Sequence, residues 1–210
     1  MGINTIIIDM YGVIIKDKTG NFLQFVYDKF NEAEHEHINK LIYEEKLFTK
    51  AGYGEISSNH FLSALGFSDP DSAMKEYIEN YLTFDDSFYS FAEKFYKKYD
   101  LVLLSTDVSE WSRYITEYYK LDKYFKHKIV SGDVHLRKPD RTIYELTLER
   151  IGRKPEECLF IDDSVTNLQQ ASEMGINTIF FNRFDNCNKS FVSVKSFDNI
   201  NQFLISSTNS

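Results

Sequence analysis

The stretch that decides the fold is Ile6-Ile7-Ile8-Asp9-Met10-Tyr11-Gly12-Val13-Ile14. Its three consecutive β-branched residues predict a fully buried strand, and the glycine that follows predicts a tight loop. Asp9 is therefore expected at the carboxyl end of a strand. Ligands of open parallel α/β sheets bind at that edge, which makes Asp9 a candidate nucleophile or metal ligand. A loop aspartate that caps a turn is the alternative that this stretch alone leaves open.

The composition is that of an acidic globular protein. A chain of 210 residues suits one large domain, or a core with a modest inserted domain, because domains usually have about 100–200 residues. The 18 Phe and 14 Tyr are far from the aromatic-poor composition of disordered chains. The net charge of −8 argues against binding to nucleic acid or to an anionic membrane surface. An anionic substrate would therefore need a local positive centre.

Cysteine usage and the N-terminus indicate a compartment. Cys158 and Cys187 have no metal-binding or redox spacing, so we expect ordinary thiols in a reducing environment. The N-terminus lacks a basic region, and Asp9 interrupts its apolar run. Neither a signal peptide nor a membrane span is expected. We therefore expect a cytoplasmic protein, whose oligomeric state the sequence does not indicate.

Helical periodicity and strand-like runs divide the chain into two parts. Residues 16–84 show helical patterns and no strand pattern, with helices expected near 22–30, 38–51, 57–65 and 71–82. After residue 85, helices and strands alternate. The expected helices are 87–99, 110–120 with Ser109 as N-cap, one opened by Pro139 and ended by Gly152, 164–174 and 198–205; the expected strands are 101–104, 127–130, 158–161 and 177–181.

Strands that alternate with helices of ten or more residues predict βαβ units and a parallel sheet. We therefore expect an α/β fold, a Rossmann-like doubly wound parallel sheet with an inserted α-helical bundle. The core domain would comprise residues 1–15 and 85–210, and the inserted domain would comprise residues 16–84.

Polar residues follow the predicted strands at one edge of this sheet: Asp9, Ser105, and the pair Asp162-Asp163. Three carboxylates gathered there repel one another, so either a pKa rises or a cation binds, and a ligand set made only of oxygen favours Mg²⁺. Lys138 precedes a helix and could supply a fixed positive charge. Taken alone, such a lysine is more often a solvated surface residue.

These residues resemble the four motifs of the haloacid dehalogenase superfamily in order and spacing. The motifs are Asp9-x-x-Gly12-Val13-Ile14, the strand-terminal Ser105, Lys138-Pro139 before a helix, and Asp162-Asp163 followed by Asn167. The resemblance covers nearly the whole chain, and the helical insertion is similar to the small cap of the first subfamily. Gly54-Glu55-Ile56-Ser57 and the residues from Arg137 to Tyr144 also resemble the branch of glucose-1-phosphate phosphatases and epoxide hydrolase N-terminal phosphatases.

This resemblance implies a Mg²⁺-dependent phosphohydrolase that acts on a small phosphorylated molecule. Asp9 would attack phosphorus and form an aspartyl-phosphate, while Lys138 would neutralise the phosphoryl oxygens. A sugar phosphate is implied by the branch alone. The substrate-binding residues would be Ser105, Thr106 and Asn167, and the metal would be bound by Asp9, the Tyr11 main-chain carbonyl, Asp162 and Asp163.

The chain departs from the family pattern at Tyr11, where phosphatases usually have a second aspartate that acts as acid and then as base. A phenol with a pKa near 10 can donate a proton but is a poor base at neutral pH. Tyr11 instead either takes a direct chemical role or packs its ring against the cap.

Tyr11 also leaves two other functions open. It resembles the Asp-x-Tyr-Gly loop of 2-haloacid dehalogenases, whose halide leaves without a proton. The Asp162-Asp163 pair argues against that alternative, because a metal-free dehalogenase would have two neighbouring carboxylates and no cation. A third possibility is a binding protein that keeps the fold but has lost turnover.

Overall fold

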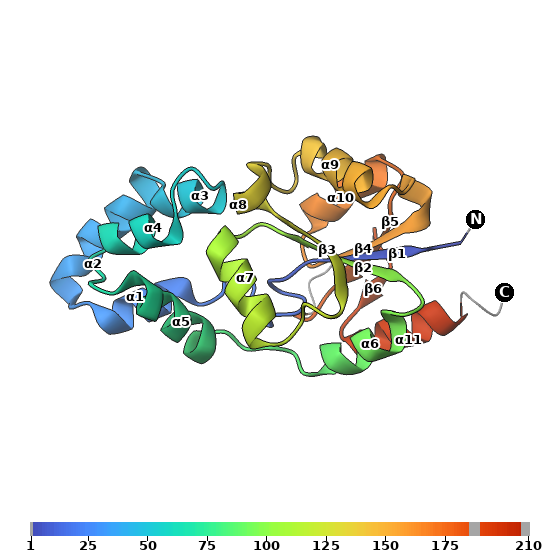
Figure 1. The fold of residues 1–210 in the computed structure, drawn as a ribbon, viewed down its shortest axis with the longest axis horizontal. Coiled ribbons are helices and arrows are strands. Elements are labelled where there is room, and N and C mark those ends of the chain that lie inside the picture. The colour runs from blue at the N-terminus through green and yellow to red at the C-terminus, as the bar shows by residue number, and fades with distance from the viewer. Residues whose placement is uncertain (1, 185–189, 207–210) are drawn as a thin grey trace.

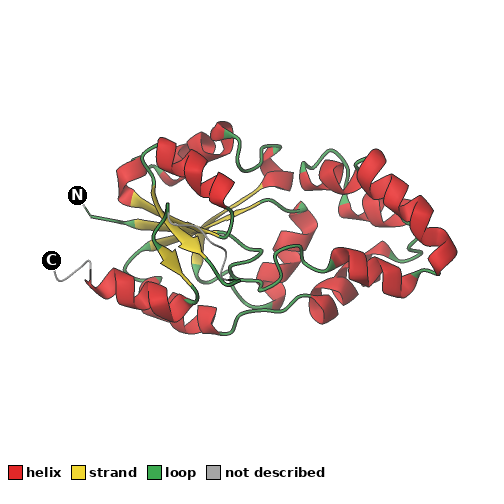
Figure 2. Cartoon of the chain, turned by 180° about the vertical axis from the view of Figure 1, so that it is seen from behind, coloured by secondary structure: helices red, strands yellow, loops and turns green. Residues whose placement is uncertain are grey.

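A computed structural model describes residues 2–184 and 190–206. In this part of the chain, six strands form one parallel sheet in the order β3-β2-β1-β4-β5-β6, which confirms the predicted α/β fold (Figures 1 and 2). The central strand β1 lies between β2 and β4, and helices pack on both of its faces, which is why Ile6-Ile7-Ile8 is buried and apolar throughout. The strands are β1 (Thr5–Ile8), β2 (Asp100–Ser105), β3 (Phe125–Val130), β4 (Cys158–Asp162), β5 (Asn177–Phe181) and β6 (Ser193–Val194).

Helices cover both faces of the sheet. Ile6 and Ile8 belong to the apolar core on one face and Ile7 to the core on the other, as the strand period of two requires. The first face is covered by α6 (Ser87–Phe95), α7 (Ser109–Tyr118) and α11 (Phe197–Ser206), and the second by α9 (Arg141–Ile151) and α10 (Val165–Glu173). The sheet is therefore doubly wound, and its strand order reverses between β1 and β4.

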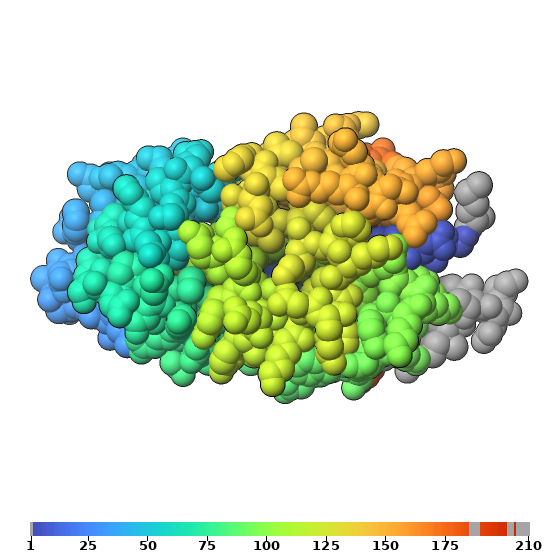
Figure 3. Space-filling model, viewed as in Figure 1, coloured from blue at the N-terminus to red at the C-terminus, as the bar shows by residue number. Residues whose placement is uncertain are grey.

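Residues 16–84, which we call the helical unit, lie at one end of the molecule (blue to green in Figures 1 and 3). The expected long helix over 38–51 is wrong: the chain leaves the helical conformation at Lys46, whose φ is +58°. The division into two domains stays a prediction. The unit consists of α1 (Phe22–Lys29), α2 (Glu32–Asn39), a π-helical turn (Lys40–Glu44), α3 (Leu47–Gly52), α4 (Ser58–Ala64) and α5 (Pro70–Tyr81).

Aromatic rings form the interior of the helical unit. Phe22 lies at their centre, with centroids of five neighbouring rings between 5.1 and 6.1 Å from its own. One of these rings is Trp111 of α7, which is fully buried and donates its indole N–H to Ser58 Oγ at 2.7 Å. Trp111 therefore joins the helical unit to the part of the chain that forms and covers the sheet, which we call the sheet domain. The two parts share one continuous apolar core.

Two predicted helix starts are wrong. Val108, and not Ser109, occupies the N-cap position of α7, and its N–H donates to the Asp107 carboxylate at 2.8 Å. Pro139 lies outside α9, which begins at Arg141, because the N–H of Asp140 donates to the carbonyl of Arg137 and closes a separate turn. The short helices α8 (Ser131–Val134) and η2 (Pro155–Glu157) and the edge strand β6 had no clear sequence signal.

The remaining sequence-based expectations concern the C-terminal part and the membrane. The predicted helix near 198–205 is confirmed as α11, and Cys158 is a buried free thiol in β4. Cys187 lies outside the described residues. Among the residues that the structure describes, no helix combines the length and the apolar character that crossing a bilayer requires.

Replacing Phe22 by alanine tests the aromatic interior. Phe22 is 3% exposed, and we expect Phe22→Ala to lower the free energy of unfolding by about 3–5 kcal/mol, because it leaves a cavity among the rings. Tyr43 is 58% exposed, so Tyr43→Ala is the control and should change stability by less than about 1 kcal/mol. Urea unfolding measures both, and equal losses would contradict the packing described here.

Candidate active site

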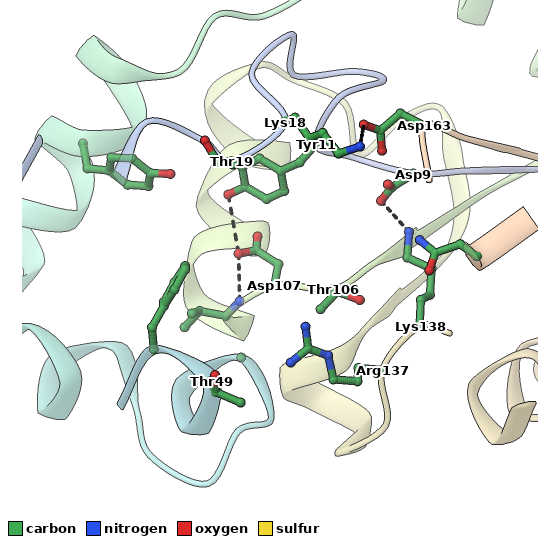
Figure 4. Close-up of a pocket in the computed structure, with 15 residues that line it drawn as sticks. Asp9, Tyr11, Lys18, Thr19, Thr49, Thr106, Asp107, Arg137, Lys138 and Asp163 are labelled. Carbon is green, nitrogen blue, oxygen red and sulfur yellow. Dashed lines mark hydrogen bonds and ion pairs between the residues drawn. The ribbon is translucent and has the colours of Figure 1, made fainter. Parts of the chain in front are cut away.

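A pocket of about 430 Å³ opens where the carboxyl ends of the strands face the helical unit (Figure 4). The loops after β1, β2 and β4 line one side of it, and residues of the helical unit line the other. Its size suits a small molecule. Six of the predicted site residues line the pocket: Asp9, Tyr11, Thr106, Lys138, Asp163 and Asn167.

Lys138 connects two of the carboxylates in this pocket. Its Nζ lies 2.6 Å from Asp9 Oδ1 and 2.8 Å from Asp162 Oδ2. Burial would lower the pKa of Lys138, but the two carboxylates outweigh that effect and raise it. The Asp9 pKa lies well above its usual value because burial, Asp162 and Asp163 oppose its charge more strongly than Lys138 favours it. Lys138 therefore remains a cation held against the predicted nucleophile.

Asp162 and Asp163 have different surroundings. Asp162 is fully buried and lies behind the pocket, where Ser164 N–H donates to its Oδ1 at 2.7 Å and Asn167 Nδ2 donates to both oxygens at 3.1 Å. Asp163 lines the pocket, and its Oδ2 forms an ion pair with Lys18 at 3.2 Å. Burial and the charge of Asp162 raise the pKa of Asp163. Asp162 thus orients Lys138 and Asn167, whereas Asp163 faces the pocket.

The three carboxylates fit a divalent cation. Asp9, Asp162 and Asp163 each offer an oxygen, and these oxygens lie within 4.8 Å of one another. Gly12 makes room for them: a Cβ at this position would lie 2.4 Å from the Asp163 carboxylate, and the φ of Gly12 is +80°. An oxygen-only set of this kind is typical of Mg²⁺ sites.

Two buried hydroxyls lie at the end of β2. Ser105 Oγ and Thr106 Oγ1 are buried and have no hydrogen-bond partner among the described residues. Thr106 lines the pocket, whereas Ser105 is fully buried beneath it. Because an unpartnered buried hydroxyl is unfavourable, the hydroxyl of Thr106 is available to a ligand group in the pocket.

The Tyr11 hydroxyl contacts the carboxylate of Asp107, a residue that the sequence did not single out. This hydroxyl donates to Asp107 Oδ1 at 3.4 Å, and both side chains line the pocket (Figure 4). Burial raises the pKa of Asp107 to about 7, although hydrogen bonds from Ser112, Val108 N–H and Tyr11 favour its charged form. Burial and Asp107 raise the pKa of Tyr11 well above its usual value, so the phenol keeps its proton. Asp107 follows a strand end, as Asp9 does, and that position was its one sequence signal.

Other pocket residues had weaker signals or none. Arg137 belongs to the motif around Lys138, but nothing in the sequence indicates that its side chain faces the site. The residues contributed by the helical unit come from a region without chemical motifs. These are Lys18, Thr19, Phe48, Thr49, Gly52 and Tyr77.

Comparison with protein families decides the classification of the chain. The model that describes haloacid dehalogenase-like hydrolases matches residues 3–175. The chain belongs to the haloacid dehalogenase-like hydrolase family. The fold, the order of the four motifs and their convergence at one sheet edge agree with this membership, so the chain is a hydrolase of this family.

Curated relatives of this haloacid dehalogenase-like hydrolase have more than one named activity. The chain is 30% identical over 88 residues to (S)-2-haloacid dehalogenase 4A of Burkholderia cepacia, covering 42% of this chain and 38% of that protein. It is 32% identical over 84 residues to flavin mononucleotide hydrolase 1 of Arabidopsis thaliana, covering 40% of this chain and 34% of that protein. The chain therefore matches little more than a third of the length of these relatives.

A solved structure shares the fold of this haloacid dehalogenase-like hydrolase over most of both chains. The family enzyme BT-2542 of Bacteroides thetaiotaomicron, in a complex with magnesium and inorganic phosphate, superposes with a TM-score of 0.74 at 22% identity. The match covers 88% of this chain and 97% of that one. At this identity the comparison shows a common fold.

Gly12→Ala tests the carboxylate site, with Gly152→Ala as the matched control. Gly152 also has a positive φ, +63°, but an added Cβ there meets no atom within 4 Å. Both variants lose about 1 kcal/mol of stability to backbone strain, but Gly12→Ala must also displace Asp163. We expect calorimetry to show Mg²⁺ affinity reduced about 10-fold or more in Gly12→Ala alone. Equal affinities in the two variants would contradict this account.

Asp107→Asn tests the buried carboxyl beside Tyr11. Its folded-state pKa of about 7 exceeds the value of about 3.9 for an unfolded aspartate. Between these two pKa values the folded protein therefore binds more protons than the unfolded chain does. The free energy of unfolding falls as the pH rises through this range. Between pH 5 and pH 8, the wild type should therefore lose about 2–3 kcal/mol more of its free energy of unfolding than the Asp107→Asn variant does.

Unfolding in denaturant at both pH values measures this effect. Glu149 is exposed on α9, so Glu149→Gln is the control and should leave the pH dependence unchanged. A wild-type pH dependence in Asp107→Asn would show that the Asp107 carboxyl does not titrate in this range.

Proposed function

We propose that this hydrolase is a Mg²⁺-dependent phosphatase that acts on a small phosphomonoester through an aspartyl-phosphate on Asp9. One observation carries the proposal: Asp9 shares its buried site with two further carboxylates, whose oxygens lie within 4.8 Å, and with the ammonium group of Lys138. A dianionic phosphoryl group next to carboxylates requires positive charge, and a lysine together with a divalent cation supplies it.

Asp9 is oriented for attack by its hydrogen bonds. Met10 N–H and Lys138 Nζ both contact Oδ1, at 2.7 and 2.6 Å. Oδ2 has no such contact in the described residues, so we propose it as the nucleophilic oxygen. Its attack on phosphorus forms the Asp9 Oδ2–P bond as the bond to the leaving alkoxide breaks, and water then hydrolyses the aspartyl-phosphate to phosphate. A bound Mg²⁺ would neutralise phosphoryl charge and align the phosphoryl oxygens with Asp9.

The phosphoryl oxygens would bind to the end of β2 and to Lys138. The unpartnered hydroxyls of Ser105 and Thr106 would donate to them, and Asn167 also lines the pocket. Within the cation site, Asp163 and the Tyr11 carbonyl would complete the ligand set with Asp9. Asp162 would act mainly by positioning Lys138, which it contacts at 2.8 Å.

Proton transfer to the leaving group is the weak point of this site. Tyr11 occupies the position of the usual acid, and its hydroxyl is held by Asp107. A phenol with a raised pKa can donate a proton but cannot act as base at neutral pH. We therefore propose that the enzyme hydrolyses esters of good leaving groups faster than those of poor ones. A sugar phosphate remains a candidate substrate on the resemblance of the motifs.

A second candidate function is supported by Tyr11 and by the similarity to (S)-2-haloacid dehalogenase 4A. In that reaction Asp9 would displace halide from carbon, and no acid would be needed. The three clustered carboxylates argue against a dehalogenase, because a reaction without a metal ion would leave their mutual repulsion without a cation to offset it.

Phosphate release distinguishes these functions. We expect release from sugar and nucleotide monophosphates in the presence of Mg²⁺, no release with a chelator, and a loss of about 10³-fold or more in Asp9→Asn, because that variant removes the nucleophile. Asp71 is exposed on α5, so Asp71→Asn is the matched control and should retain full activity.

Other outcomes of this assay would support one of the alternative functions. Halide release from 2-haloacids without metal, together with no phosphate release, would establish a dehalogenase. If neither product forms, the phosphatase proposal is wrong, and a binding protein that has lost turnover is the remaining alternative.

A further inference from the structure

Arg137 differs from the other cations of the pocket in lacking a carboxylate partner. Lys138 is paired with Asp9 and Asp162, and Lys18 is paired with Asp163. Arg137 lines the same pocket, but its guanidinium forms no hydrogen bond or ion pair with any residue in 2–184 or 190–206. Its charge is therefore available to a ligand.

Other half-buried arginines of the chain show what such a side chain normally does. Arg153 contacts the Asp100 carboxylate at 2.9 Å, and Arg183 contacts that of Asp85 at 2.7 Å. Arg137 is also half-buried, but its guanidinium stacks only on the ring of Tyr53, with the guanidinium carbon 5.3 Å from the ring centroid. Stacking on a ring leaves the N–H groups in the guanidinium plane free to donate.

Contacts between the helical unit and the sheet domain hold Tyr53 in place beneath Arg137. Tyr53 is held by its carbonyl, which lies 2.6 Å from His135 Nδ1, and the neighbouring Gly52 carbonyl accepts from Ser131 Oγ at 2.6 Å. At Gly54, a Cβ would lie 2.1 Å from the Gly132 carbonyl, so the two segments are in close contact. The platform under Arg137 is therefore held by two side-chain-to-backbone contacts and by the close approach of Gly54 to the Gly132 backbone.

The guanidinium is directed into the pocket from the loop that carries Lys138, on the side of Thr106 (Figure 4). Phe48 and Thr49 of α3 line the same pocket. The proposed transferring phosphoryl group is already served by Lys138 and the hydroxyls of Ser105 and Thr106. Arg137 lies where the rest of the substrate would pass toward the helical unit.

We propose that Arg137 binds a second oxyanion on the leaving group, so that the substrate class is a small phosphomonoester with a carboxylate or a second phosphate. The inference rests on the proposed phosphatase function. Both oxyanions match the fork of a guanidinium, which can donate two parallel hydrogen bonds to either. Arg137 is thus a specificity residue that touches the non-reacting part of the substrate.

Three substrates with a common two-carbon skeleton test this proposal: ethyl phosphate, phosphoglycolate and ethylene glycol bisphosphate. The wild-type enzyme should prefer one or both of the doubly acidic compounds to ethyl phosphate. Arg137→Gln should lower kcat/KM on the preferred compound about 10–100-fold, because a charge-assisted pair is lost. The loss should appear mainly in KM, because the interaction is made equally before and during reaction.

Ethyl phosphate and two further variants are the controls. Arg137→Gln should change kcat/KM on ethyl phosphate by less than about threefold, since that compound offers no second anion. Arg137→Lys should retain part of the preference, because it keeps the charge but loses the fork. Arg150 is exposed on α9, away from the pocket residues, so Arg150→Gln should match the wild type.

Equal losses on all three substrates would overturn the proposal and place Arg137 on the transferring phosphoryl group. No loss on any of them would show that Arg137 does not contact substrate. Either result would leave the phosphatase function itself intact.

A binding measurement separates this inference from a failure of the phosphatase proposal. If no phosphate is released, calorimetry with Mg²⁺ should still show phosphonoacetate binding more tightly than ethylphosphonate, and Arg137→Gln should abolish the difference. Equal affinity of the wild type for the two phosphonates would overturn the second-anion site.

Discussion

The position of Lys138 between Asp9 and Asp162 is the contact on which the site depends. Three buried carboxylates at one sheet edge would be unstable together, because each one raises the free energy of the others' charged forms. A single ammonium group within 2.8 Å of two of them offsets part of that repulsion. It also ties the loop before α9 to the ends of β1 and β4, so the same ion pairs that compensate charge set the geometry of the site.

The parallel sheet explains why these residues meet. β1 and β4 are neighbours, and Ile8 pairs with Ile161, so the next residues of both strands emerge at the same level. Asp9 and Asp162 are therefore adjacent despite their separation of about 150 residues in the chain, in line with the rule that ligands bind where the strand order reverses. Helices on both faces bury the strands and leave this edge as the place where polar groups can meet a ligand.

The helical unit lines the side of the pocket that faces this edge. It contributes an aromatic interior that includes Trp111 of the sheet domain, and its Tyr53 ring supports Arg137. The chemistry is thus confined to the sheet edge, whereas the side of the pocket that would hold the leaving group is built by both parts together. Lys18 of the helical unit also contacts the carboxylate site through its ion pair with Asp163.

The sequence by itself determined the parallel α/β fold, and it predicted which polar residues gather at one edge of the sheet. Alternating strands and helices, together with carboxylates at strand ends, are local signals, and the structure places Asp9, Lys138, Asp162 and Asp163 together as expected. The helix starts at Ser109 and Pro139 were wrong because neighbouring contacts, a carboxylate at Val108 N–H and a turn at Arg137, override local preference.

Only the tertiary structure decided the surroundings of Asp107 and Arg137. Burial between α7 and Tyr11 raises the pKa of Asp107 to about 7, and the sequence does not reveal how much water a strand-end carboxyl will lose. The Tyr53 platform joins residues more than eighty positions apart. Burial and long-range stacking are properties of the packed chain, so no pattern of neighbouring residues could have indicated them.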